Sequence, residues 1–172
     1  MIYAPSEDTY LMCKALEKNV PNKSSKILEV GVGSGYVLEF LKKRGFQNAL
    51  GIDINPKAVE FCKKRKLKVI RSDLFSRVKD KFGIIIFNPP YLPEDKREDK
   101  NSKLSTTGGK YGSEVINRFL SEAKIHLKKG GKIFLVTSSL TKRIDWKGYK
   151  KRKVGEKKLF FEKLNVWELS IL

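Results

Sequence analysis

The chain has 172 residues, of which 40% are hydrophobic, which suits one α/β domain around a single core. Residues 1–172 are therefore expected to form one domain. No apolar run approaches the roughly 20 residues of a membrane-spanning helix, and no secretory apolar segment follows Met1, so we expect a cytoplasmic protein that does not enter a membrane. Cys13 and Cys62 lie far apart without flanking histidines, so the sequence predicts no metal site.

The net charge of +18 is the unusual number in the composition. Nine of the basic residues lie in Lys142–Lys158, with Trp146 and Tyr149 between them. Such a surface attracts polyanions, and the interleaved rings could stack on bases, so a contact with RNA is one interpretation. A lysine-rich surface of the thermophile type is the other. Charge therefore does not choose between a nucleic-acid and a protein substrate.

Predicted strands and helices alternate along the chain after a first helix, Ser6–Lys18, whose N-cap is Ser6. The predicted strands are Ile27–Val30, Leu50–Asp53, Lys68–Arg71, Ile84–Phe87 and Lys132–Thr137, and the predicted helices are Val37–Arg44, Pro56–Lys64 and Ser113–Lys128. This alternation predicts a parallel sheet. Gly130 and Gly131 are expected to end the last helix, and two more strands, Lys151–Lys157 and Leu164–Ile171, follow. The polar stretch Glu94–Lys110 is interpreted as a lid, with a long solvated loop as the alternative.

A glycine-rich turn follows the first predicted strand. Glycines at positions 31, 33 and 35 allow backbone angles closed to other residues and let a ligand lie against the main chain. The dinucleotide fingerprint would need its last glycine where Tyr36 stands, so the spacing does not favour NAD. Glu29 adds a carboxylate at the end of the strand, which suits a cationic ligand better than a pyrophosphate.

Acidic residues follow the next two predicted strands. Asp53 ends the second strand, where a carboxylate can accept hydrogen bonds from both ribose hydroxyls. Asp73 follows the third strand, at the expected height for an adenine amino group. A plain helix N-cap is the alternative role for Asp73.

The sequence Asn88-Pro89-Pro90-Tyr91 directly follows the apolar run Phe82–Phe87. Two prolines have no backbone N–H and cannot extend the ladder, so they must turn the chain out at the carboxyl edge of the sheet, where open α/β sheets bind ligands. This turn leaves the Asn88 side chain and the Pro89 carbonyl as acceptors beside the Tyr91 ring. The four residues are the predicted catalytic group.

Taken in order, these motifs resemble class I S-adenosylmethionine-dependent methyltransferases. The segments Tyr3–Leu11, Phe87–Pro93 and Gly108–Ile116 are similar to the HemK-type glutamine methyltransferases, in particular the short archaeal and eukaryotic branch. That resemblance implies a Rossmann-like, mostly parallel seven-stranded sheet of order 3-2-1-4-5-7-6, and methylation of the GGQ glutamine of class I release factors. It further implies a small zinc-binding activator as partner. Val32 stands where the family usually has threonine.

The resemblance also implies a site for S-adenosylmethionine that includes Thr9 from the amino-terminal segment. The implied cofactor residues are Thr9, Glu29, Gly31, Gly33, Gly35, Asp53, Asp73, Leu74 and Asn88.

Three functions fit the motifs. The first is transfer of a methyl group to a glutamine side-chain amide, with Asn88 and the Pro89 carbonyl holding the nitrogen in line with the methyl group. The second is an RNA or DNA methyltransferase acting on adenine N6 or guanine N2, because an exocyclic base nitrogen fits the same acceptors. The third, a binding protein without catalysis, is disfavoured by the intact set of site residues.

Overall fold

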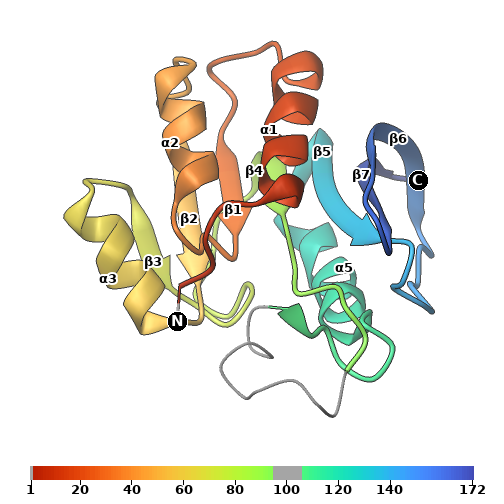
Figure 1. Ribbon diagram of the computed structural model, residues 1–172. Helices are drawn as coiled ribbons and strands as arrows, with labels where there is room; N and C mark the ends of the chain where they lie inside the picture. Colours follow the sequence, from red (N-terminus) through yellow and green to blue (C-terminus); the bar gives the residue numbers. More distant parts are fainter. Residues whose placement is uncertain (1, 95–105) are drawn as a thin grey trace.

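The computed structural model describes residues 2–94 and 106–172. Its core is a seven-stranded sheet of order β3-β2-β1-β4-β5-β7-β6, as predicted. The strands are β1 (Ile27–Val30), β2 (Ala49–Asp53), β3 (Val69–Arg71), β4 (Phe82–Phe87), β5 (Leu127–Ser138), β6 (Tyr149–Lys158) and β7 (Lys163–Ile171). The helices are α1 (Glu7–Asn19), α2 (Tyr36–Lys43), α3 (Pro56–Lys64) and α5 (Glu114–His126). Figure 1 shows their arrangement.

Parallel pairing brings the site-bearing ends of the strands together. In β1, Val30 pairs with Ile52 of β2 on one side and with Phe87 of β4 on the other. The turns that leave β1, β2 and β4 therefore start at the same edge of the sheet, where α/β folds bind their ligands. Strand β7 runs antiparallel to β5 and β6, and it forms a carboxyl-terminal hairpin with β6 from the two strands predicted there.

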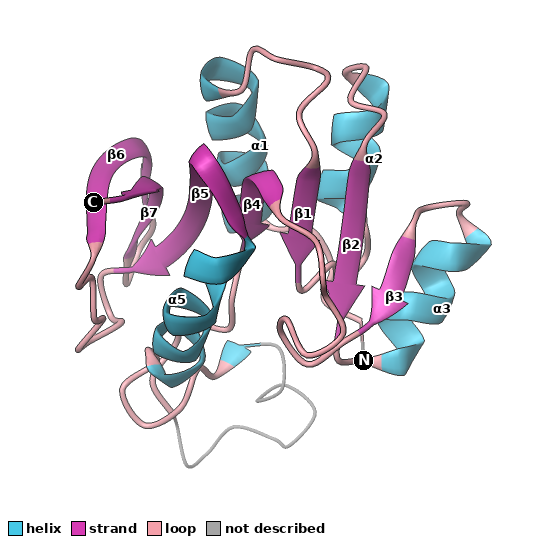
Figure 2. Ribbon diagram, turned by 180° about the vertical axis from the view of Figure 1, so that it is seen from behind, coloured by secondary structure: helices cyan, strands magenta, loops and turns pink. Residues whose placement is uncertain are grey.

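Alternate residues of the buried strands face two helical layers. Ile84 and Ile86 pack on the side of α1 and α2, whereas Ile85 and Phe87 pack on the side of α5. Figures 1 and 2, which view the molecule from opposite sides, show α1 and α2 before one face and α5 before the other. The loop after β3 contributes Leu74, Phe75 and Val78 to the α5 side of the core. Both faces are thus covered, as a parallel sheet requires.

The predicted end of the last helix is wrong. Helix α5 ends at His126 and β5 begins at the next residue, so Gly130 and Gly131 lie inside a strand instead of ending a helix. Leu127 pairs with Phe82 of β4, and the register shifts before Ile84 pairs with Lys132. The glycines occupy this irregular stretch, where Gly130 has a φ of +73°.

The remaining boundaries differ from the predicted ones by a few residues. Ser6 precedes α1 as its N-cap, and its backbone N–H donates to Thr9 Oγ1 at 3.4 Å. The lid predicted at Glu94–Lys110 falls mostly on residues 95–105, which lie outside the described residues. No helix in the described ranges is long and apolar enough to cross a membrane.

Candidate active site

A cavity of about 710 Å³ opens at the carboxyl edge of the sheet, a size typical of small-ligand sites. It is lined by turns after β1, β2, β3 and β4, by the start of α1 and by one side of α5. The predicted site residues that line it are Thr9, Glu29, Gly31, Gly33, Asp53, Asp73, Leu74, Asn88, Pro89, Pro90 and Tyr91. Segments far apart in sequence thus converge on one cavity.

Gly35 is the one predicted cofactor residue that is not among the described residues lining the cavity. It is the N-cap of α2 with a φ of +76°, and a Cβ there would meet the side chains of Leu67 and Cys62 at 2.6 and 2.8 Å. Gly35 therefore permits the close packing of the start of α2 against α3. It supports the glycine turn without lining the cavity.

Asp53 holds the glycine turn in place. Its Oδ2 accepts a hydrogen bond from the Gly33 N–H at 2.9 Å, and its Oδ1 accepts one from the Asn55 N–H at 2.8 Å. Each carboxylate oxygen can accept a second hydrogen bond, so both remain able to receive ribose hydroxyls. Burial raises the pKa of Asp53, and the Asn55 and Gly33 amides oppose that shift.

Glu29 lies at the floor of the cavity with a buried carboxylate. Its Oε2 is buried and makes no hydrogen bond within the described part of the chain. Burial, with the charge of Asp53 second, raises the pKa of Glu29 well above its usual value. A carboxylate in this position is stabilised by a cationic ligand, because the added positive charge offsets lost solvation.

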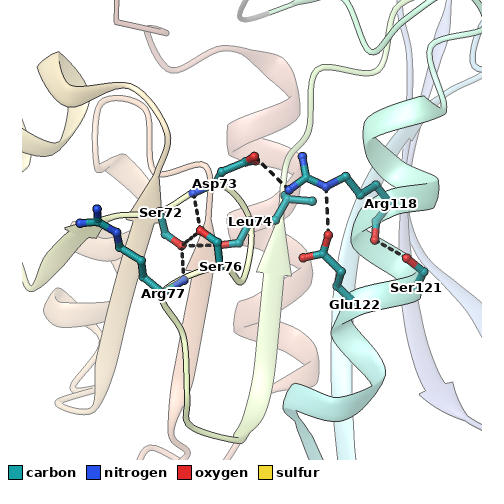
Figure 3. Close-up of polar contacts among 8 residues, drawn as sticks. All are labelled: Ser72, Asp73, Leu74, Ser76, Arg77, Arg118, Ser121 and Glu122. Atoms are coloured by element: carbon teal, nitrogen blue, oxygen red, sulfur yellow. Dashed lines mark hydrogen bonds and ion pairs between the residues drawn. The ribbon is translucent and has the colours of Figure 1, made fainter.

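Asp73 is fixed from both sides, as Figure 3 shows. Its carboxylate forms an ion pair with Arg118 of α5 at 3.0 Å, and its N–H donates to Ser76 Oγ at 3.2 Å. The next residue, Leu74, has a φ of +42°, which is uncommon outside glycine and typical of functional turns. Arg118 also pairs with Glu122 at 2.9 Å and lines the cavity. Arg118 could not be singled out from the sequence, because an arginine on an amphipathic helix usually lies on a solvated face.

Asn88 and the two prolines form the other wall. Asn88 Oδ1 is buried and accepts no hydrogen bond from any described residue, although buried amide oxygens normally have a partner. Pro89 is buried, Pro90 is half-buried, and neither has an N–H to satisfy that oxygen. The turn therefore holds a buried acceptor, without a partner among the described residues, in the wall of the cavity.

Asp8 fixes the aromatic side of the same wall. Its Oδ2 accepts hydrogen bonds from the hydroxyls of Tyr3 at 2.7 Å and Tyr91 at 3.0 Å, while its Oδ1 accepts from the Thr9 N–H at 2.6 Å. Burial raises the pKa of Tyr91, so its hydroxyl stays protonated and acts as a donor. Asp8 thereby joins α1 to the proline turn. In the sequence, Asp8 had only the signature of a first-turn helix acid.

A second glycine turn supports the proline turn from outside. The Gly108 N–H donates to the Leu92 carbonyl at 2.9 Å, and the Leu92 N–H donates to the Thr106 carbonyl at 2.9 Å. Gly112 has a φ of +79°, and a Cβ there would overlap the Tyr91 carbonyl oxygen. Backbone thus packs directly on backbone, which only glycine allows.

The site fits S-adenosylmethionine on its own chemistry. Asp53 can bind ribose hydroxyls, and Asp73 can accept an adenine amino group. The buried carboxylate of Glu29, whose Oε2 has no partner among the described residues, suits a cation. Asn88 and Pro89 stand beside that set and can receive a substrate nitrogen. This fold and cavity define a class I S-adenosylmethionine-dependent methyltransferase.

Solved structures agree with this class. The chain superimposes on the E. cuniculi Mtq2–Trm112 complex with a TM-score of 0.80 and 26% identity, covering 99% of each chain. That complex is described as responsible for methylation of the eRF1 translation termination factor. A T. thermophilus 16S rRNA N2 G1207 methyltransferase, bound to AdoMet and guanosine, matches with a TM-score of 0.66 and 18% identity over 96% of this chain and 43% of its own.

Sequence relatives narrow the class further. The family model of the methyltransferase small domain matches residues 7–145. A Methanocaldococcus jannaschii protein provisionally named a protein N5-glutamine methyltransferase is 37% identical over 98% of this chain and 92% of its own. Mouse methyltransferase HEMK2 is 34% identical over 79% of this chain and 71% of its own. The chain belongs to the methyltransferase small domain family, within its HemK-type branch, and it uses S-adenosylmethionine. The predicted resemblance and cofactor are confirmed.

Proposed function

We propose that this enzyme methylates the side-chain amide nitrogen of the GGQ glutamine in a class I translation release factor. The observation that carries the proposal is the buried, unpartnered Oδ1 of Asn88 in a turn that lines the cofactor cavity. An amide –NH2 offers two hydrogens, and the Asn88 Oδ1 and the Pro89 carbonyl are the acceptors that we assign to them. The protein relatives named above support a glutamine substrate.

Alignment is the main task of these residues, because the amide lone pair is delocalised and the nitrogen is a weak nucleophile. S-adenosylmethionine supplies an activated sulfonium methyl group when bound. Asn88 and Pro89 hold the amide nitrogen in line with that methyl carbon and stabilise the positive charge that develops on nitrogen. Tyr91, anchored by Asp8, packs on the amide plane. With the cofactor bound, the new N–C bond would form as the S–C bond breaks, and the nitrogen would then lose a proton to solvent.

The cofactor residues that we propose are Thr9, Glu29, Gly31, Gly33, Asp53, Asp73, Leu74 and Asn88, with Gly35 in a supporting position. We propose that residues 1–172 act as one methyltransferase domain, because turns at one edge of a single sheet, together with α1 and α5, line this site. A translation factor as substrate would place the enzyme in the cytoplasm.

The experiment is methyl transfer from tritiated S-adenosylmethionine to the purified release factor of the same organism. We expect label in the wild-type factor and none after the GGQ glutamine is replaced by glutamate, because the two acceptors would then face carboxylate lone pairs. Label that persists in the glutamate variant would contradict the proposed acceptor.

Ribosomal or transfer RNA is the second candidate substrate, favoured by the net charge of +18 and by the structural likeness to an rRNA N2 guanine methyltransferase. Bulk RNA is therefore assayed beside the release factor. Raising salt weakens docking on either substrate of opposite charge, so salt sensitivity does not distinguish them. Label at a defined base, with none in the release factor, would establish the RNA reaction instead.

We also propose a small zinc-binding protein as an activating partner, supported by the two-protein complex of the E. cuniculi neighbour. Affinity purification of the tagged chain from its own cells, followed by mass spectrometry and zinc analysis, tests this. We expect a stoichiometric small protein that carries zinc and raises the turnover of the purified chain. Full activity of the isolated chain would contradict a required partner.

A further inference from the structure

Two aromatic side chains project from the tip of the β6–β7 hairpin. Phe160 is 92% exposed and Phe161 is 83% exposed, and their ring centroids lie 4.6 Å apart at an interplanar angle of 86°. A single exposed apolar side chain is ordinary, whereas an adjacent pair of nearly bare rings at one tip forms a contiguous apolar patch. No described part of the chain covers this patch.

The tip that carries the rings is firmly anchored. The Leu159 N–H donates to the Glu162 carbonyl at 2.8 Å, which closes the turn, and the Leu159 side chain packs against the core cluster on the α1 side. The strands pair up to Lys158 and Lys163, directly below the turn. The rings are therefore presented on an ordered support, which lowers the entropic cost of binding a partner.

A chain of hydrogen bonds links this tip to the proline turn. The Ser138 hydroxyl donates to the Glu162 carboxylate, and the Ser138 N–H donates to Thr141 Oγ1 at 3.2 Å. The Thr141 hydroxyl in turn donates to the Tyr91 carbonyl at 2.8 Å. Ser138 is the last residue of β5, so the tip stands at the same carboxyl edge of the sheet as the cavity. A macromolecule that inserts a side chain into the cavity must approach this edge of the sheet, where the tip also lies.

The charges around the tip specify what kind of segment it fits. Lys157, Lys158 and Lys163 flank the two phenylalanines, but Lys157 pairs with Glu7 and Lys163 pairs with Glu156 at 3.6 Å. Lys158 is exposed and forms no ion pair among the described residues. Glu162 is the acidic residue of the turn, and its carboxylate accepts a hydrogen bond from the Ser138 hydroxyl. A segment with an apolar side chain and a neighbouring carboxylate complements this surface, because the rings bind the apolar side chain and Lys158 attracts the carboxylate.

We propose that the Phe160–Phe161 tip is a docking site for the protein substrate. It binds a segment that carries an apolar side chain beside an acidic one, and this segment belongs to the same polypeptide that delivers its amide side chain to Asn88. The proposal rests on the proposed protein methylation and adds the surface that selects the substrate. Exposed aromatic anchors of this kind commonly carry most of the binding energy of an interface.

The test is the kinetics of a double variant, Phe160→Ser with Phe161→Ser, acting on the full-length release factor. We expect the KM for the release factor to rise at least tenfold, while kcat at saturation stays within twofold. Cofactor affinity by calorimetry and the melting temperature should both be unchanged, because neither ring touches the cavity or the core. Leu172→Ser is the matched control, since Leu172 is also 83% exposed but lies at the other end of the hairpin. It should leave KM unchanged.

A photo-crosslinking residue, p-benzoylphenylalanine, in place of Phe160 provides a direct readout. We expect an adduct with the release factor from position 160 and none from position 172. If wild type methylates the release factor but the double variant keeps its KM, the docking proposal alone is wrong. If wild type does not methylate the release factor, the proposed function fails and the docking proposal fails with it. A rise in KM for RNA without one for the release factor would also overturn the proposal.

Discussion

Arg118 of α5 and Asp73 of the turn after β3 form an ion pair of 3.0 Å across the rim of the cofactor cavity. Both side chains are about half exposed, and Arg118 also holds Glu122 of its own helix (Figure 3). The pair leaves Asp73 with a second oxygen that can accept the adenine amino group. A residue of α5 thus orients the side chain of Asp73, which we assign to the cofactor.

We therefore expect Arg118→Ala to weaken S-adenosylhomocysteine binding by about two- to fivefold, since exposed ion pairs contribute up to about 1 kcal/mol. Asp73→Ala should cost about 1–3 kcal/mol, because it removes the hydrogen bond itself. Isothermal calorimetry measures both. Glu122→Gln is the control and should bind normally, because Glu122 contacts Arg118 from outside the cavity lining. A loss in Asp73→Ala without any in Arg118→Ala would show that Asp73 needs no such support.

The raised pKa of Glu29 predicts a pH-dependent stability. Between the unfolded pKa of about 4.3 and the higher folded pKa, the native state binds more protons than the unfolded state, so the free energy of unfolding falls as pH rises. Glu29→Gln removes this penalty. In urea unfolding of the cofactor-free protein, the free energy of unfolding of the variant should increase relative to that of wild type as pH rises from 4 towards 8.

The same substitution should weaken binding of S-adenosylmethionine, because the cationic ligand loses its carboxylate partner. The two effects have opposite signs, which separates a binding role from a structural one. A variant that is less stable than wild type at neutral pH would contradict the assignment of Glu29 to a ligand.

Asn88→Ala should leave the fold and most of the cofactor affinity intact and lower the methylation rate by about a hundredfold or more, as expected for loss of one preorganised polar group. Single-turnover transfer of tritiated methyl measures this. Asn165→Ala is a useful comparison, since Asn165 Oδ1 is likewise buried without a partner among described residues but lies in β7, away from the cavity lining. Equal slowing in both variants would assign the effect of Asn88 to packing.

Gly112→Ala should slow methyl transfer while sparing cofactor binding, because the added methyl group would displace the Tyr91 carbonyl and with it the proline turn. Gly45→Ala is the matched control. Gly45 has a similar φ of +88° but no atom within 4 Å of an added Cβ, so it measures backbone strain alone. The expected difference is in kcat. Equal losses in the two variants would mean that strain, and not contact with the turn, explains the effect.

Local sequence patterns predicted the parallel strands and most of the residues that line the cavity, because these features depend on local chemistry. The order of the strands followed from the family resemblance. Two prolines after an apolar strand must turn the chain, and an acid at the end of the second strand must lie beside the first glycine turn once the strands are parallel. The sequence therefore placed Asn88 and Asp53 correctly at one edge.

Features set by tertiary contacts were not visible in the sequence. Gly130 and Gly131 carry the local signal of a helix end, but pairing of Leu127 with Phe82 draws the residues before them into β5. The role of Asp8 depends on Tyr91, which reaches it only through the fold. The role of Arg118 was likewise not predictable, because its partner Asp73 lies on a different element.

The edge strand β6 bears a row of exposed cations, Lys150, Lys151, Arg152 and Lys153. An open edge can recruit a strand from another molecule, but a second β6 would bring lysines opposite lysines, and the register shift between Lys153 and Gly155 further disrupts pairing. The positive charge therefore disfavours pairing of β6 with the β6 strand of another copy, and so disfavours aggregation. Two bare phenylalanines can stand at the tip of this hairpin because the strand beneath them repels its own copies.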